Sequence, residues 1–539
     1  MTGGQKLDAV IIGAGHNGLV CAGYLAAKGL RVRLCERRDI VGGAAVTEEF
    51  HPGFRNSTAS YTVSLLHPRI VRELRLAEHG LRIVERTFAN FLPLPDGDSL
   101  KVGGGLAATQ AEVARHSRKD AEALPAYYER LERVADVLRD LQLETPPNTG
   151  GGVHDLFQAW KAAKRFRALD RQGRQDVLDL FTMGAGDWLE RWFESEPIKA
   201  CFGFDAVVGS FVSPYAQGSA YMLLHHVFGE VNGNKGAWGH AIGGMGAITQ
   251  ALAAEVRRRG VEISVGAPVA EVMLAPDGHA SGIRLADGTE VAARVGIGNV
   301  NPRLLLTQLV GKPDQGRFDL QRFQHYQCES ASFRMNLALS ELPDFLCLPG
   351  SAAQPHHGSG IIMAPSLGYM ERAYVDARAE GWSAAPVVEM LLPSTMDTTL
   401  APPGQHVASL FCQHFRYALP FGRHWDEARE AVADLVIGTV ARYAPNFTRS
   451  VIARQIHSPL DLERKFGLVG GDIFHGKLTL NQLFSARPML GSADYRTPIP
   501  GLYLCGAGAH PGGGVTGVPG HNAAREIWRD RRRWSHRRA

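Results

Sequence analysis

The sequence predicts an α/β fold, because strands and helices alternate at both ends of the chain and again near its middle. Residues 8–36 read as strand, glycine turn, helix and second strand, and residues 243–285 as a glycine-led helix followed by short strands. A buried strand enters another glycine loop at residues 501–506. Such alternation is typical of a mainly parallel sheet covered by helices. The chain of 539 residues has room for about two to four folding units.

The bulk composition excludes several classes of protein. Hydrophobic residues make up 45% of the chain, and the net charge of +4 does not favour nucleic acid as a partner. No stretch approaches the roughly eighteen uninterrupted apolar residues of a membrane span. The seven cysteines include no C-x-x-C pair, which argues against a redox dithiol, a zinc ribbon and a disulfide framework. Because the first strand begins at Asp8, we expect no targeting peptide and cytoplasmic residence.

The first glycine turn, Gly13-Ala14-Gly15-His16-Asn17-Gly18, has the spacing of a dinucleotide-binding fingerprint. Gly13 permits the tight turn, Gly15 lets a pyrophosphate approach the backbone, and Gly18 allows helix and strand to pack closely. The helix over residues 17–28 would direct free N–H groups and the positive end of its dipole at the phosphates. Glu36 ends the second strand and can accept hydrogen bonds from ribose hydroxyls. Together these features predict a bound dinucleotide.

The residues that follow Glu36 bear on which dinucleotide binds. Arg37 and Arg38 could hold a 2′-phosphate, which would favour NADP, whereas Glu36 would repel that phosphate. The pair Gly42-Gly43 resembles the continuation found in FAD-binding flavoproteins, where this backbone also lies along the cofactor. FAD is therefore the predicted cofactor.

The region between the nucleotide-binding segments is predominantly helical at first and then mixed. Apolar residues recur every three or four positions from Leu124 to Leu141, which predicts a packed face on a helix over about 115–145. Pro125 either kinks this helix or marks its start. Residues 146–152 predict a surface loop, and residues 261–285 predict short strands joined by tight turns.

Four motifs stand in order along the chain. They are DAVIIGAGHNGLV…CERRDIVGGAAVTEEFHPGFRNSTASY (8–61), GNKGAWGHAIGGMGAITQ (233–250), GGDIFHGKLTLNQLFSARP (470–488) and GLYLCGAGAHPGGGVTGVPGHNAARE (501–526). Together they resemble the phytoene desaturase-like flavoproteins. Within that family, the most similar branch is the one called pyridine nucleotide-disulfide oxidoreductase domain-containing protein 2. Disulfide chemistry is not inherited from that name, because the chain has no C-x-x-C pair.

The resemblance implies a fold like that of amine oxidases and carotenoid desaturases. A discontinuous Rossmann-like FAD-binding domain would comprise residues 1–75, 236–303 and 485–539. An inserted α+β substrate domain with a helical part would comprise residues 76–235 and 304–484. The same resemblance implies a set of cofactor-binding residues: Gly13, Gly15, His16, Asn17, Gly18, Glu36, Arg37, Gly42, Gly43, Ala44, Pro268, Val269, Gly506, Ala507, Gly512, Gly513, Gly514 and Val515.

One position departs from the wider flavoprotein pattern. Many relatives place Asp after the C-terminal glycine, to hold the ribityl and pyrophosphate part of the cofactor, and here that position is Ala507. The desaturase-like branch also often lacks this Asp. The absence of Asp at position 507 therefore favours the desaturase-like branch over other flavoproteins, and FAD remains the predicted cofactor.

Two histidines are the candidate catalytic residues. His510 abuts the loop Gly512–Gly517, whose glycines would let the backbone lie against a flavin ring, and it could act as an acid or base near neutral pH. The alternative is a loop histidine that only fixes the turn. His475 either lines the substrate cavity or caps a turn, and for Trp238 core packing is the preferred interpretation. No spacing of His, Cys and carboxylate residues predicts a metal site.

The C-terminal tail is basic and aromatic. Its residues of these kinds are Trp528, Arg529, Arg531, Arg532, Arg533, Trp534, Arg537 and Arg538. Such a tail could touch an anionic membrane surface, which would suit a lipophilic substrate. A solvated chain end is the alternative.

The leading hypothesis for function is a flavoenzyme that desaturates, saturates or isomerises carbon–carbon bonds in a hydrophobic small molecule, with hydride transfer to or from flavin N5. A flavin amine or alcohol oxidase using O2 is the alternative enzyme, and a flavin-containing assembly factor without turnover is the alternative from another class. An aromatic cage at the flavin would favour an amine oxidase, and a long apolar tunnel would favour a desaturase. The oligomeric state is not predicted.

Overall fold

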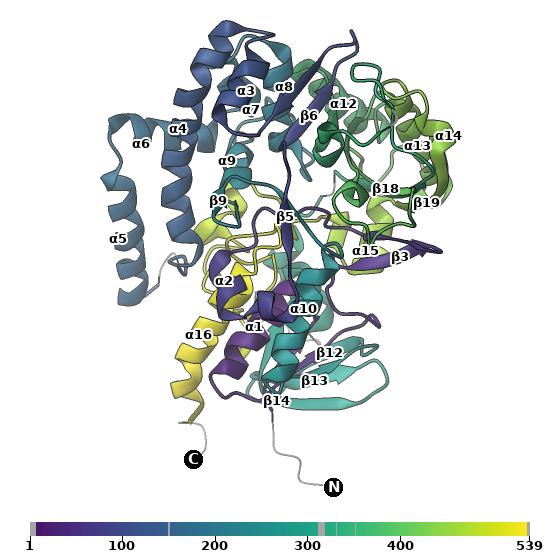
Figure 1. Ribbon diagram of the computed structural model, residues 1–539. Coiled ribbons are helices and arrows are strands. Elements are labelled where there is room, and N and C mark those ends of the chain that lie inside the picture. The colour runs from purple at the N-terminus through teal and green to yellow at the C-terminus, as the bar shows by residue number, and fades with distance from the viewer. Residues whose placement is uncertain (1–6, 149–150, 311–318, 330, 351, 536–539) are drawn as a thin grey trace.

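The computed structural model describes residues 7–148, 151–310, 319–329, 331–350 and 352–535. Figure 1 shows a lower part that contains both chain ends and an upper part built around a second sheet. A layer of helices, including α4 (Arg118–Gln142), α5 (Val153–Ala168) and α6 (Arg171–Thr182), forms the left edge of the molecule in that view.

The first sheet has seven strands drawn from three distant segments of the chain. They are β1 (Leu7–Ile12), β2 (Val32–Cys35), β11 (Glu262–Ser264), β12 (Val269–Leu274), β13 (Ala280–Leu285), β14 (Glu290–Gly298) and β20 (Leu502–Leu504). Strands β11, β2, β1, β14 and β20 lie side by side and parallel, while β13 pairs antiparallel with β12 and with the first half of β14. The α/β fold is confirmed.

Three helices cover one face of the parallel strands. The central helix is α1 (His16–Ala27), and it packs between α10 (Gly246–Arg258) and α16 (Val518–Ser535). A Cβ atom at Gly520 would lie 2.1 Å from the backbone oxygen of Asn17, so α16 approaches the start of α1 more closely than any side chain at this position allows. This contact brings the C-terminal segment to the first glycine turn.

The second sheet also has seven strands. In spatial order they are β19 (Val451–His457), β15 (Phe333–Leu339), β18 (His406–Gln413), β17 (Val387–Leu391), β16 (Gly360–Met363), β6 (Asn90–Pro93) and β7 (Ser99–Val102). Only the pair β6–β16 is parallel among the pairs of this sheet. All these strands come from residues 76–235 and 304–484, while the strands of the first sheet come from the other three segments; the domain boundaries themselves stay a prediction.

Both faces of the second sheet are buried, and successive residues contribute to different cores. Ile361 and Met363 join the core beneath α13 (Trp425–Ala441), whereas Ile362 between them joins the core of the helical layer. This alternation is the period of two that a strand imposes on its side chains. The helical layer contains α3 (Leu106–Val113), α4, α6, α7 (Ala185–Glu190), α8 (Glu196–Val207), α9 (Tyr221–Val227) and α12 (Leu367–Glu380).

Smaller elements connect the two sheets. The hairpin of β3 (Thr47–His51) and β4 (Phe54–Ser57) packs against β18 and β19, and β5 (Ile83–Glu85) pairs with β10 (Gly239–Ala241). The remaining elements are α2 (Pro68–Glu73), β8 (Glu230–Val231), β9 (Asn234–Lys235), α11 (Pro302–Leu304), α14 (Phe447–Ser450) and α15 (Pro459–Phe466). Among the described helices, none combines the length and the apolar character needed to cross a membrane.

The predicted helix over about 115–145 is confirmed as α4, and its periodic apolar residues are buried. Pro125 lies inside this helix, so the interpretation that it marks the start is wrong. The helix starts earlier because the side chain of Ser117 accepts a hydrogen bond from the Asp120 N–H at 3.1 Å and caps the first turn. In the predicted loop, residues 149–150 lie outside the described part of the chain.

Candidate functional site

A cavity of about 330 Å³ lies at the carboxyl ends of the parallel strands β1, β2 and β14. Eleven of the residues predicted to bind the cofactor line it: Gly13, Gly15, His16, Asn17, Glu36, Arg37, Gly43, Ala44, Pro268, Val269 and Ala507. The carboxyl edge of such a sheet is where open α/β folds bind nucleotides, since several loops and helix N-termini converge there.

The first glycine turn is packed so tightly that side chains are excluded from it. A Cβ atom at Gly18 would lie 2.4 Å from the backbone oxygen of Gly13, and one at Gly15 would lie 3.0 Å from Nδ2 of Asn299. The Asn299 amide also donates a hydrogen bond to the Gly13 carbonyl at 3.1 Å. Asn299 directly follows β14 and holds the turn from the neighbouring strand, so the backbone N–H groups at the start of α1 stay accessible.

Glu36 lies beside this turn with its carboxylate buried and held in place. Its Oε2 accepts a hydrogen bond from the Ala14 N–H at 2.8 Å, and its Oε1 accepts one from the Arg38 N–H at 3.0 Å. Each carboxylate oxygen keeps a further lone pair that can accept a hydrogen bond from a ribose hydroxyl. The structure thus places Glu36 where the fingerprint predicts it.

The two arginines after Glu36 line the cavity, but their guanidinium groups are engaged by the protein. Arg38 donates to Glu48 at 2.7 Å and stacks on the Phe466 ring at 5.1 Å. Arg37 donates to the backbone oxygen of Arg464 at 3.1 Å. These contacts leave Nη1 of Arg38 without a hydrogen-bond partner, and Glu48 also pairs with Lys465 at 3.0 Å, so the arginines do not distinguish FAD from NADP.

A second cavity of about 130 Å³ adjoins the first. Four residues line both cavities: His16, Ala44, His475 and Ala507. The second cavity is otherwise bounded mainly by apolar and aromatic side chains and by the C-terminal glycine loop: Tyr61, Leu65, Val208, Trp238, Phe411, Ile473, Phe474, Gly513, Gly514 and Val515. Trp238 therefore lies on the cavity wall, and its interpretation as a core residue is wrong.

Two half-buried histidines, each with a fully buried ring nitrogen, line both cavities where these meet. Burial lowers the pKa of His16 to about 3, helped by the nearby His475, and burial lowers the pKa of His475 to about 4, helped by Arg487. Nε2 of His16 and Nδ1 of His475 have no hydrogen-bond partner within the protein. A buried ring nitrogen without a partner is costly, so both atoms are suited to bind a ligand at the junction. His475 thus lines the cavity, as the first of its two interpretations predicts.

Arg487 holds the loop that bears His475 against the loop that begins at Gly506. Its side chain is fully buried, and its guanidinium donates hydrogen bonds to the backbone oxygens of Phe474, Gly476, Lys477, Gln482 and Ala507 at 2.7–3.3 Å. One planar side chain therefore connects the segment around His475 to the loop that begins at Gly506. This residue lies in the third of the four sequence motifs, but only its contacts reveal its role.

A cluster of ionisable groups lies next to Tyr61, on the side of this residue that faces away from the second cavity. The Tyr61 hydroxyl donates a short hydrogen bond to Glu389, and the Arg334 guanidinium lies 4.8 Å from the centre of the Tyr61 ring. Burial raises the pKa of Glu389, although Arg86, Tyr61 and Arg334 oppose the rise. Burial also raises the pKa of Asp205 to about 8, and Glu389 adds to that rise. Proton-binding groups are thus connected to the cavity through Tyr61.

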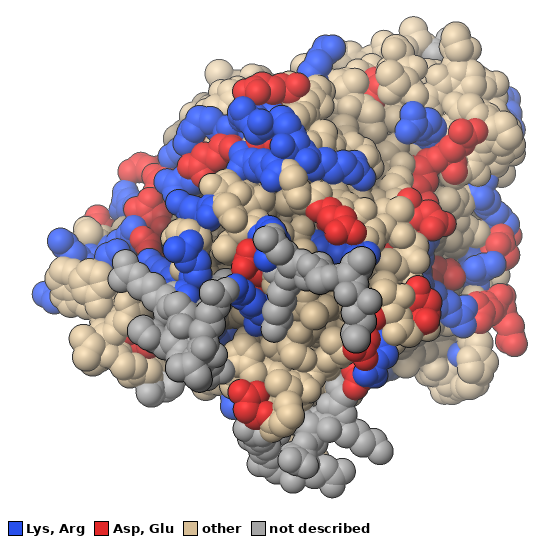
Figure 2. Space-filling model, turned by 90° about the horizontal axis from the view of Figure 1, so that it is seen from below, with Lys and Arg blue, Asp and Glu red and all other residues tan. Residues whose placement is uncertain are grey.

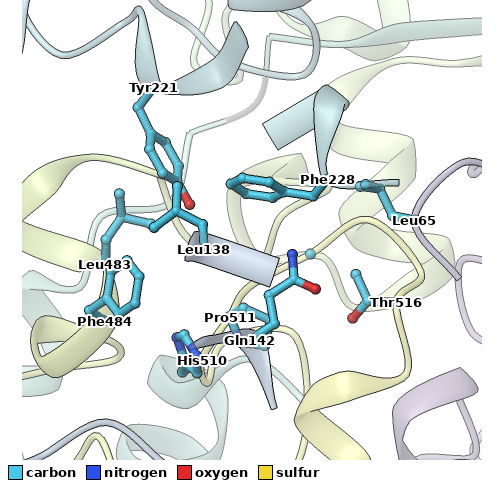
Figure 3. A pocket seen from close by; sticks show the side chains of 11 residues that line it. Leu65, Leu138, Gln142, Tyr221, Phe228, Leu483, Phe484, His510, Pro511 and Thr516 are labelled. Atoms are coloured by element: carbon cyan, nitrogen blue, oxygen red, sulfur yellow. The ribbon is translucent and has the colours of Figure 1, made fainter. Parts of the chain in front are cut away.

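His510 lines a separate, narrow pocket, which Figure 3 shows. Its ring lines a pocket of only about 20 Å³ with Leu138, Tyr221 and Phe484, and its Nε2 hydrogen-bonds to the backbone oxygen of Leu141 at 3.2 Å. Burial lowers the pKa of His510 to about 4. His510 is not among the described residues that line the first or the second cavity. This position favours a histidine that fixes the loop, the alternative to a catalytic role.

Four predicted cofactor-binding residues line neither of the two cavities: Gly18, Gly42, Gly506 and Gly512. Gly18, Gly42 and Gly506 instead let backbones approach closely; for example, a Cβ atom at Gly42 would lie 2.6 Å from the Ala45 oxygen. Gly512 packs against the side chains of Leu478 and Arg487. Conversely, the sequence interpretation missed Asn299, Tyr61 and Arg487. For Asn299 a signal was available, since it ends a strand that is parallel to β1.

The lowered pKa values of three histidines predict how the free energy of unfolding depends on pH. His16, His475 and His510 stay neutral in the folded state, whereas an unfolded histidine takes up a proton below about pH 6.5. The unfolded state therefore binds more protons, and the free energy of unfolding should decrease as the pH falls from about 6.5 to about 4. At pH 5.5 the free energy of unfolding should be lower by about 1.4 kcal/mol for each of these rings than it is well above pH 6.5.

Urea unfolding measured at several pH values tests this expectation. The variant His475→Gln removes one of the histidines whose pKa is lowered, so its free energy of unfolding should decrease less steeply with falling pH. Equal slopes for the variant and the natural protein would show that His475 is not held neutral.

Comparisons with known proteins agree with this geometry. A family model described as flavin containing amine oxidoreductase matches residues 18–313. A mouse protein named pyridine nucleotide-disulfide oxidoreductase domain-containing protein 2 is 42% identical, over 97% of this chain and 94% of its own length. A limonene dehydrogenase component from Castellaniella defragrans is 24% identical, over 98% of this chain and 95% of its own length.

A solved structure of wild-type putrescine oxidase bound to putrescine shares the fold, with a TM-score of 0.59 and 16% identity, and the match covers 98% of this chain and 99% of that one. The resemblance inferred from the four motifs is confirmed by the mouse relative. The chain therefore belongs to the flavin-containing amine oxidoreductase family, whose members use a flavin cofactor, and is an oxidoreductase of that superfamily.

Proposed function

We propose that this protein is an FAD-dependent oxidoreductase that acts on a hydrophobic small molecule by carbon–carbon desaturation, saturation or isomerisation. The observation that carries the proposal is the second cavity, which is largely apolar and meets the nucleotide cavity at His16, Ala44, His475 and Ala507. A substrate in the second cavity would face whatever part of the cofactor reaches that junction. Limonene dehydrogenase is named for oxidation of a hydrocarbon, which supports this substrate class.

The residues of the nucleotide cavity fit FAD. Gly13, Gly15 and Gly18 form a cradle that side chains would fill, and the N-terminus of α1 offers N–H groups to the pyrophosphate. Glu36 can accept the ribose hydroxyls, and Pro268 and Val269 line the same end of the cavity. The unpartnered nitrogens of His16 and His475 supply polar contacts at the junction, where the flavin ring would lie.

Bound FAD would supply the group that accepts or donates a hydride at N5. The chain's own residues would orient the substrate and exclude water, since Leu65, Val208 and Ile473 line the second cavity. Tyr61 is the residue suited to hold or move a proton at the substrate, because its hydroxyl already donates to Glu389 behind the wall. The raised pKa of Glu389 makes that carboxylate a better proton acceptor.

The wall of the second cavity argues against an amine substrate. The rings of Tyr61 and Phe411 contact each other, with centroids 4.8 Å apart, so no slot for an amine lies between them. The Arg334 guanidinium lies over both rings, 4.8 Å from the centre of Tyr61 and 5.4 Å from that of Phe411. A substrate ammonium group would meet a like charge there.

Anaerobic reduction tests the proposal. Purified protein with bound flavin is reduced and then offered O2, a quinone or unsaturated hydrocarbons, and reoxidation is followed by visible absorbance. Fast reoxidation by an unsaturated apolar compound or a quinone supports the proposal. Exclusive reoxidation by O2 with an amine as the reductant would support the amine oxidase instead. A flavin that no acceptor reoxidises would support an assembly factor without turnover.

The variant Tyr61→Phe should slow substrate-dependent turnover by about 100-fold, the contribution expected of a positioned proton donor. Flavin content should stay unchanged, since Tyr61 lines only the second cavity. The same change at Tyr369, whose hydroxyl donates to the Pro386 oxygen at 3.0 Å outside both cavities, is the matched control and should leave the rate unchanged. A Tyr61→Phe rate equal to that of the control would exclude a role in proton transfer.

A further inference from the structure

Helix α5 exposes the residues that a surface helix normally buries. Val153, Leu156, Phe157 and Trp160 are 84%, 69%, 49% and 58% exposed. Their spacing of i, i+3, i+4 and i+7 places all four on one face of the helix. Single exposed apolar residues are common on proteins, but four large ones on one face form a patch that marks a binding surface.

The opposite face of α5 packs against the protein, and it carries Gln158 together with the partly buried Ala162 and Phe166. Gln158 is the buried residue of this helix, with 7% exposed, and its amide contacts the His154 ring at 3.4 Å. Asp155, the acidic residue in the first turn, accepts a hydrogen bond from the Asn148 N–H at 2.7 Å. The four exposed residues thus form an additional apolar face on the side of the helix that the protein leaves uncovered, and this face needs a partner other than solvent.

Three basic residues of α5 lie on the same side of the helix as its exposed apolar residues. At 100° per residue, Lys161, Lys164 and Arg167 lie on the side of the apolar face, in the C-terminal half of the helix. The Lys161 ammonium lies 5.2 Å from the centre of the Phe157 ring, and the Lys164 ammonium lies 5.5 Å from that of Trp160. Aromatic rings bordered by lysines are the composition of helices that lie in a membrane interface, where phosphates meet hydrocarbon.

The position of α5 connects this face to the interior. The helix forms the left edge of the molecule in Figure 1 and packs on α4. Seen from below in Figure 2, the same edge carries blue Lys and Arg side chains next to protruding tan ones. From α4, Leu138 and Gln142 line the narrow pocket of Figure 3, which shares Leu65 and Gly513 with the apolar second cavity.

We propose that α5 docks this protein on membranes that contain anionic lipids, with Leu156, Phe157 and Trp160 inserted among the acyl chains and the basic residues on the phosphates. The apolar face and the positive charges complement these two layers of a lipid surface together. In the described part of the C-terminal tail, Arg529 pairs with Glu526 at 2.7 Å, and Trp528 is the one large apolar residue of α16 that is not buried, with Arg531 at 4.1 Å and Lys28 at 5.8 Å from its ring. The side chains of residues 532–539 lie outside the described part.

Docking itself is independent of the proposed function, although a membrane would also be the source of a lipophilic substrate. Membrane binding and turnover are therefore measured separately. A failure of the flavin assays leaves the docking result valid, and a failure of docking leaves the flavin assays valid.

Vesicle co-sedimentation of the flavin-loaded protein tests the proposal. The natural protein should sediment with vesicles of phosphatidylcholine and phosphatidylserine, less with phosphatidylcholine alone, and less at high salt, because salt screens the basic residues. The triple variant Leu156→Ser, Phe157→Ser and Trp160→Ser should bind the anionic vesicles at least about tenfold more weakly, with unchanged flavin content.

A matched control changes an exposed aromatic residue elsewhere. Phe421 is 77% exposed and lies outside α5, so Phe421→Ser should bind vesicles like the natural protein. Equal vesicle binding by the triple variant and the natural protein would overturn the proposal. A natural protein that binds no vesicles but dissociates into smaller species when the triple change is made, as measured by analytical ultracentrifugation, would also overturn it and would assign the face to a second copy of the chain.

Discussion

Replacing Arg487 with methionine is expected to lower the free energy of unfolding by about 3–5 kcal/mol and to remove most of the bound flavin. The five backbone oxygens that this guanidinium satisfies are in segments 474–482 and at Ala507, and methionine offers them no donor. Buried acceptors without partners are costly, and the two loops would separate at the junction of the cavities. Thermal unfolding and flavin content of the purified variant measure the two effects.

Two further variants test whether the loss of stability comes from the hydrogen bonds of the Arg487 guanidinium. Arg487→Lys keeps the charge but lacks the planar fork, so it should recover only part of the stability. Arg449→Met removes an arginine whose side chain is 77% exposed and which pairs with Glu341 at 3.3 Å, and it should cost at most about 0.5 kcal/mol. If Arg487→Met unfolded at the same temperature as Arg449→Met, the role of Arg487 as a clamp would be excluded.

The variant Gly18→Ala is expected to bind FAD at least about tenfold more weakly. Its Cβ atom would lie 2.4 Å from the Gly13 oxygen and 2.8 Å from Nδ2 of Asn299, which are a backbone atom and the amide that holds the turn. Neither can move without opening the cradle, so α1 would be pushed away from the phosphate position. Titration of the flavin-free protein with FAD measures the loss.

Gly23→Ala is the matched control, because it adds the same methyl group to the same helix. There the nearest atoms are Cδ2 of Leu74 at 3.1 Å and Cγ1 of Val256 at 3.3 Å, which are flexible side-chain ends. The change also favours the helix by up to about 1 kcal/mol, which offsets the crowding. Equal FAD affinity of the two variants would mean that the turn is not a cradle for the cofactor.

The nucleotide-binding half of the site could be predicted from local sequence. A turn that contains Gly13, Gly15 and Gly18 between a strand and a helix depends on backbone freedom over a few residues, and Glu36 follows at the end of the next strand. Such features are encoded by residues close together in the chain. The C-terminal half could be located only by resemblance, because it lies almost the whole chain length away from Gly13.

The residues on the substrate side of the site could not be placed from local sequence. From their loops, His510 was the leading candidate and His475 the second, each with a turn-fixing role as its alternative, and Trp238 was expected in the core. Their roles differ because α4 closes over His510 through Leu141, whereas His475 is turned toward the cavity by the loop that Arg487 holds. Neither contact has a signature in the local sequence, because the partners are far apart along the chain.

The sequence by itself determined the α/β fold, the strand–turn–helix that cradles a dinucleotide, and the family. Only the tertiary structure decided which histidines face the junction of the cavities, that Tyr61 connects to Glu389, and that α5 presents its apolar face outward. The first set depends on short-range backbone geometry and periodicity. The second depends on which distant segments meet when two sheets and a helical layer pack together, and no window of sequence contains both partners of such a contact.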